Sequence, residues 1–129
     1  MKRHLGNKGE QVAHKFLEEN GYTILHKNWR YTHKEIDIIA QQEEILAFIE
    51  VKTRRNQANL APHELFTKAK QRHYIECAYA YGALFDMMEY SFRFDILCIH
   101  ATRGGMNIEH WRDVIDVRDI MDCRHTYWK

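Results

Sequence analysis

The sequence predicts an α/β or α+β fold, a mixed β-sheet flanked by helices with the elements in the order α-β-β-β-α-β-β. Two segments repeat apolar residues at helical spacing, and several apolar runs of strand length are separated by polar turns. The 129 residues contain no internal repeat and no linker. We therefore expect a single domain that spans residues 1–129.

The first helix is predicted to begin at Asn7, which can cap it, because Glu10 stands three residues later in the capping-box position. Its apolar stripe consists of Val12, Ala13, Phe16 and Leu17. The pair Asn20-Gly21 is typical of a helix end. Residues 22–29 then read as a strand.

The next two strands, KEIDIIA (34–40) and ILAFIEVK (45–52), are the most informative pair. Alternation places Phe48, Glu50 and Lys52 on one face of the second strand. If the polar residues QQEE (41–44) form a tight hairpin, an even loop length puts Asp37 on the same side as Glu50. An odd loop would place the two carboxylates on opposite faces.

An irregular stretch with the only proline, Pro62, precedes a long helix predicted over about 63–84. The predicted inner stripe of this helix is Phe66, Ala69, His73, Cys77, Ala80, Tyr81 and Leu84. Strands are expected over 91–100 and 108–111, and a short helix in the acidic tail.

The composition indicates a soluble cytoplasmic protein. The net charge is +1, no apolar run has the length of a membrane span, and the start lacks a signal-peptide core. The three cysteines are widely spaced, which is typical of reduced cytosolic thiols, and neither they nor the nine histidines show zinc-site spacing. The segment between positions 52 and 73 contains six Lys or Arg residues and only one acid. It is therefore either a phosphate-binding region or a solvated surface helix.

Two carboxylates that converge at the end of a buried strand repel each other and lose hydration. Mg²⁺ or Mn²⁺ would relieve the repulsion between Asp37 and Glu50, since hard cations prefer oxygen ligands. Lys52 could then orient a bound water or stabilise charge on a phosphate, which suits phosphodiester hydrolysis. The alternative is an ordinary Glu50–Lys52 pair with Asp37 hydrogen-bonded nearby.

The segments GNKGEQVAHKFLEENGYTILHKNWR, EIDIIA, FIEVKTR and RFDIL, in this order, resemble the YraN-like family of uncharacterised bacterial proteins over essentially the whole chain. That family is similar in fold to archaeal Holliday-junction resolvases and to the restriction-endonuclease-like superfamily. The resemblance implies Asp37 and Glu50 as metal ligands, with the Val51 carbonyl as a third, and Lys52 as the catalytic lysine. It also implies Glu10 as a site acid on the first helix. Glu10 therefore has two alternative roles, as part of the helix cap or as a residue of the site.

Two positions depart from the pattern that the resemblance implies. Ile36 stands where the superfamily motif has proline, and Lys34 stands where relatives have glycine. Because junction resolvases act as dimers, the resemblance also makes a homodimer an expectation.

The expected partner is nucleic acid, most simply DNA. Candidate phosphate contacts are Arg54, Arg55, Lys68, Lys70, Arg72 and Arg30. Arg93 and Asp95 lie on one face of an apolar strand, and a structural ion pair is favoured over a catalytic role.

We expect a Mg²⁺- or Mn²⁺-dependent endonuclease that acts on branched or otherwise structured DNA. One alternative is a nucleic-acid-binding module with an idle nuclease-like site. Another is a protein-interaction domain, which would use the acidic tail and Tyr127-Trp128.

Overall fold

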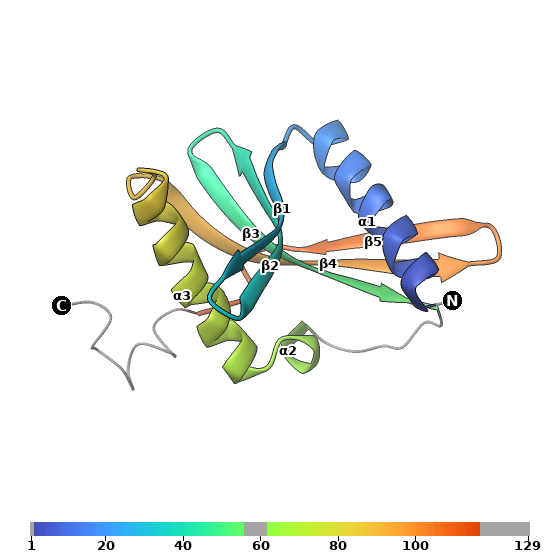
Figure 1. Ribbon diagram of the computed structural model, residues 1–129. Coiled ribbons are helices and arrows are strands. Elements are labelled where there is room, and N and C mark those ends of the chain that lie inside the picture. The colour runs from blue at the N-terminus through green and yellow to red at the C-terminus, as the bar shows by residue number, and fades with distance from the viewer. Residues whose placement is uncertain (1, 56–61, 117–129) are drawn as a thin grey trace.

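The computed structural model describes residues 2–55 and 62–116 (Figure 1). Its elements are α1 (Lys2–Glu19), β1 (Thr23–Tyr31), β2 (Lys34–Gln42), β3 (Ile45–Arg54), α2 (Pro62–Leu65), α3 (Lys68–Leu84), β4 (Ser91–Thr102) and β5 (Gly105–Trp111). The predicted order α-β-β-β-α-β-β is confirmed, with the one-turn helix α2 as an addition.

The five strands form one mixed sheet in the order β1-β2-β3-β4-β5. Strands β3 and β4 are parallel, and the other neighbours are antiparallel. A parallel pair needs a long crossover connection, and the segment that contains α2 and α3 supplies it. The two longer helices lie on opposite sides of the sheet, α1 with one core cluster and α3 with the other (Figure 1).

Helix α1 begins earlier than predicted. It starts at Lys2, so Asn7 lies inside the helix and the predicted capping box at Asn7 is wrong. Lys, Arg and Leu, which precede Asn7, favour helix and allow this extension. The predicted end is confirmed: Gly21 has φ 88°, and the Tyr22 amide donates to the Leu17 carbonyl, as in a Schellman motif.

The hairpin between β2 and β3 has the even loop on which the site prediction depends. Gln42 pairs with Ile45, which leaves a two-residue turn, and the ladder runs to the pair Ile38–Ile49. One step further along this register, Asp37 stands opposite Glu50. The predicted convergence of the two carboxylates on one side of the sheet is therefore confirmed.

The long helix predicted over 63–84 is instead two helices. Thr67 interrupts it and caps α3, since its Oγ1 accepts from the Lys70 amide at 3.2 Å. The buried residues of α3 are Gln71, Tyr74, Ile75, Cys77, Ala78, Tyr81 and Gly82. The predicted stripe was wrong at Ala69, His73 and Leu84, which are exposed, because Tyr74, Ala78 and Tyr81 define the inner face.

The acidic-tail helix and Tyr127-Trp128 lie outside the described residues. Within residues 2–55 and 62–116, no helix has the length and apolar character needed to cross a membrane.

Candidate functional site

The two opposed carboxylates of β2 and β3 form the centre of the candidate site. Asp37 Oδ2 accepts a hydrogen bond from the Val51 amide at 2.8 Å. Burial and the neighbouring Glu50 carboxylate raise the pKa of Asp37 from 3.8 to about 7, although the Val51 amide and Lys70 act in the opposite direction. Asp37 therefore changes its charge near neutral pH.

Both carboxylate oxygens of Glu50 have partners, and the residue is only 3% exposed. The Tyr74 hydroxyl donates to Oε1 at 2.6 Å. The ammonium groups of Lys52 and Lys70 each lie 3.0 Å from Oε2. Burial raises the pKa of Glu50, but the Tyr74 hydrogen bond and the two ammonium groups outweigh burial, so the pKa is lowered and Glu50 is ionised.

Helix α3 therefore contributes two residues, Lys70 and Tyr74, to a site whose predicted metal ligands and catalytic lysine all lie on β2 and β3. The Lys70 ammonium, predicted as a phosphate contact, lies beside Glu50, and Tyr74 was not predicted as a site residue. The two are four positions apart and lie on one side of the helix. The spacing of Tyr74 with Ala78 and Tyr81 was the available signal that Tyr74 faces the sheet.

The donor set fits a hard divalent cation. Asp37 and Glu50 offer carboxylate oxygens on one side of the sheet, and Mg²⁺ commonly binds through one or two carboxylates while it keeps several waters. In the described part of the chain, no group of three or more His, Cys, Asp or Glu residues could hold a metal ion. The remaining ligands would be waters, phosphate oxygens and the predicted Val51 carbonyl.

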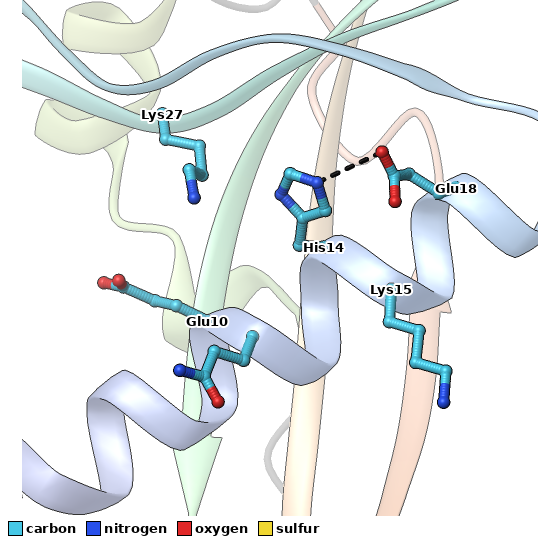
Figure 2. A pocket seen from close by; sticks show the side chains of 6 residues that line it. Glu10, His14, Lys15, Glu18 and Lys27 are labelled. Carbon is cyan, nitrogen blue, oxygen red and sulfur yellow. Dashed lines mark ion pairs between the residues drawn. The ribbon is translucent and has the colours of Figure 1, made fainter.

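Glu10 lies apart from this centre. Gly9 of α1 faces β3, where its position approaches the Thr53 side chain, whereas the next residue, Glu10, is exposed. Figure 2 shows Glu10 beside a hollow that it lines with His14, Glu18 and Lys27. Among the described residues, no contact joins Glu10 to Asp37 or Glu50, so its role as a site acid stays a prediction.

The remaining predicted phosphate contacts are dispersed over the surface. Arg54 is half-buried and donates to the Thr53 carbonyl at 3.2 Å, whereas Arg55 is exposed and lies on the α1 side. Lys68 and Arg72 are exposed on α3. Arg30 is exposed and lies 3.6 Å from the Glu35 carboxylate.

The predicted ion pair between Arg93 and Asp95 is confirmed. Arg93 Nη2 lies 2.8 Å from Asp95 Oδ2, which His110 Nε2 also contacts at 2.9 Å. The backbone amide of Asp113 donates to the other oxygen at 3.0 Å. Although burial raises the pKa of Asp95, these partners hold it below its usual range. Arg93 also donates to Tyr22, a member of the core cluster beneath α1, so the pair belongs to the face opposite Glu50.

The chain was compared with models of known protein families, and one family model matches most of its length. Residues 9–99 match the model of the uncharacterised protein family UPF0102. The chain belongs to the UPF0102 family.

Relatives confirm this assignment over nearly the whole length. A UPF0102 protein of Lawsonia intracellularis is 35% identical over 97% of this chain and 95% of its own. A UPF0102 protein of Bacteroides thetaiotaomicron is 39% identical over 84% of this chain and 89% of its own. A third, of Caldicellulosiruptor saccharolyticus, is 38% identical over 95% and 98%.

Proposed function

We propose that this UPF0102 protein binds nucleic acid and carries a Mg²⁺- or Mn²⁺-dependent nuclease site at Asp37, Glu50 and Lys52. The observation that carries the proposal is the direct opposition of two carboxylates on adjacent buried strands, with an ammonium group 3.0 Å from one of them. This arrangement agrees with the resemblance to the restriction-endonuclease-like superfamily.

Each residue has a distinct role in this proposal. Asp37 and Glu50 hold the cation, which when bound would polarise a phosphodiester and lower the pKa of a water molecule. Lys52 orients that water or stabilises negative charge on the phosphate, because its ammonium lies at the rim of the carboxylate pair. Tyr74 fixes the Glu50 carboxylate through its 2.6 Å hydrogen bond.

A second function has its own supporting observation. Lys52 and Lys70 already compensate the charge of Glu50, so this buried carboxylate is stable without a cation. A nucleic-acid-binding module with an idle nuclease-like site would have the same geometry. The two functions differ in cleavage and in cation binding.

The substrate and the oligomeric state follow from the resemblance alone. Structured or branched DNA and a homodimer are carried over from the similarity to junction resolvases, and a cytoplasmic location is carried over from the composition. They are parts of the proposal that separate measurements must test.

The deciding experiment compares cleavage of labelled four-way junction, flap, single-stranded and linear duplex DNA in Mg²⁺ and in Mn²⁺. The variants are Glu50→Gln and Lys52→Ala. Glu44→Gln, in the β2–β3 turn, and Lys15→Ala, exposed on α1, are matched controls. Binding of the same substrates is followed in EDTA.

Cleavage that only the Glu50 and Lys52 variants abolish, while their binding in EDTA persists, would support the nuclease. Binding without cleavage of any substrate would favour the idle module. Absence of both would refute the proposal. An RNA copy of each substrate distinguishes DNA from RNA as the partner.

A further inference from the structure

A second basic surface lies away from the carboxylate pair. The start of α1, the end of β3 and the β4–β5 turn together line a hollow of about 580 Å³. Figure 1 shows these three segments at the same end of the molecule. The lining residues are Lys8, Val12, Arg55, Ala101, Thr102, Arg103, Gly105 and Met106. This set contains three cations and no acid.

The absence of acids distinguishes this hollow from two others. The hollow beside α1 has Lys15 and Lys27 but also Glu10 and Glu18. A hollow beside α3 has Lys34, which pairs with Glu76 at 3.1 Å. In the described part of the chain, Lys8, Arg55 and Arg103 form no ion pair, so no described carboxylate compensates their charges.

Three uncompensated cations that come from separate elements are complementary to a chain of phosphates. All three side chains are exposed and therefore accessible to a large partner. Next to Arg103 stand Gly104, in the turn, and Gly105, at the start of β5, which have no side chains. The space around them is open, since a Cβ at either position would have no neighbour within 4 Å. A phosphate can thus approach the backbone of this turn closely.

The hollow is also within reach of the proposed site. Arg55 follows Glu50 by five residues, which corresponds to about 17 Å along an extended strand. A duplex advances 3.4 Å per nucleotide, so this span is on the order of five nucleotides. The hollow lies on the α1 side of the sheet and Glu50 on the α3 side, so a nucleic acid that contacts both regions passes around the end of β3.

We infer that Lys8, Arg55 and Arg103 form a phosphate-backbone contact that holds the nucleic acid beside the candidate cleavage site. The inference rests on the proposed function, since it assumes that nucleic acid is the partner. It predicts a contact that reads no base sequence, because phosphate contacts position a protein without specifying bases.

The test measures binding of labelled duplex and four-way-junction DNA by fluorescence anisotropy, in EDTA, between 50 and 200 mM salt. The full chain is compared with the triple variant Lys8→Ala/Arg55→Ala/Arg103→Ala. The matched control is Lys15→Ala/Lys27→Ala/Arg112→Ala, which removes the same charge from other exposed positions. Urea unfolding verifies that both variants fold.

The triple variant should bind more weakly, and the slope of log Kobs against log salt should decrease in magnitude by about 2 to 3, since each phosphate contact contributes about 0.9. The control variant should change this slope by less than about 1. Equal affinity and slope in wild type and triple variant would overturn the inference and leave the proposed function intact. Failure of the wild type to bind any substrate would overturn both.

Discussion

At the scale of single residues, Glu50 is the group of the candidate site with a hydrogen-bond or ion-pair partner on each carboxylate oxygen. A tyrosine hydroxyl occupies one oxygen, and two lysines from different elements share the other. Such a carboxylate is fixed in position and kept ionised, which is what a metal ligand requires. Because these contacts also contribute to the free energy of unfolding, the partners of Glu50 can be tested by stability measurements without an activity assay.

Tyr74→Phe removes the 2.6 Å hydrogen bond to Glu50 and leaves the ring packed against Phe66. The free energy of unfolding should fall by about 1.5 to 3 kcal/mol, as for a hydrogen bond to a charged group. Urea denaturation followed by far-UV circular dichroism measures this loss. Tyr31→Phe, at an exposed position, is the matched control, and an equal loss there would contradict the role assigned to Tyr74.

Asp37 gives the molecule a pH-dependent stability. Its pKa of about 7 in the folded protein exceeds the ordinary 3.8, so the folded state binds the proton more tightly than the unfolded chain. The contribution of Asp37 to the free energy of unfolding should therefore fall as pH rises from about 4 to about 7, and level off above that. Asp37→Asn should abolish this part of the decline.

Urea unfolding of wild type and Asp37→Asn at pH 5 and pH 8, in EDTA, measures the difference. The variant should gain stability relative to wild type at pH 8. Asp86→Asn, exposed after α3, serves as the control. If Mg²⁺ binds at Asp37, adding it at pH 8 should raise the unfolding midpoint of wild type but not of Asp37→Asn.

At the scale of elements, the close approach of α1 to β3 depends on Gly9. A Cβ at this position would lie 2.5 Å from Thr53 Oγ1 and 3.2 Å from Thr53 Cγ2. Helix α1 can therefore rest on the sheet only because residue 9 has no side chain. The sequence motif that contains Gly9 does not reveal this contact, since Thr53 is 44 residues away.

Gly9→Ala should destabilise the protein by about 1 to 3 kcal/mol through overpacking. In a Thr53→Ala background the same change should stabilise by up to about 1 kcal/mol, because alanine favours helix over glycine. A double-mutant cycle from urea unfolding measures the coupling. Gly104→Ala has open space around it, and additive effects of Gly9→Ala and Thr53→Ala would disprove the close approach.

The element boundaries show where sequence patterns suffice. Alternation predicted that an even loop would place Asp37 and Glu50 on one side, and the two-residue turn, shorter than the predicted QQEE (41–44), meets this condition and fixes the register locally. The start of α1 was predicted wrongly because Asn is a preferred N-cap residue but is also tolerated inside a helix at a modest cost in free energy. The break at Thr67 was missed because apolar spacing continues across it.

At the scale of the whole molecule, β2, β3 and β4 contribute to both core clusters. The fully buried Asp95 reinforces this connection by contacting Arg93, His110 and the Asp113 amide. Because the two faces share strands, the predicted single domain should unfold in one transition.

Asp95→Ala removes a fully buried carboxylate and leaves the partly buried Arg93 charge uncompensated, which should cost about 3 kcal/mol. The loss should shift the whole transition, since the network links β4, β5 and the segment that follows β5. Urea unfolding followed both by tryptophan fluorescence and by far-UV circular dichroism checks this, and the two curves should coincide for wild type and variant.

Glu35→Ala is the matched control, because it removes the half-buried partner of the exposed Arg30 and should cost less than about 1 kcal/mol. Separate midpoints for the two probes would show that the faces unfold independently. The prediction of one domain would then be wrong.

The sequence by itself determined the element order, the convergence of Asp37 and Glu50 on condition of an even loop, and the Arg93–Asp95 pair, because strand alternation acts over a few residues. Only the tertiary structure decided that Lys70 and Tyr74 reach Glu50, that Glu10 lies beside Lys27, and that Lys8, Arg55 and Arg103 share one hollow. These contacts join distant segments, and the packing of α1 and α3 on opposite faces of the sheet sets them.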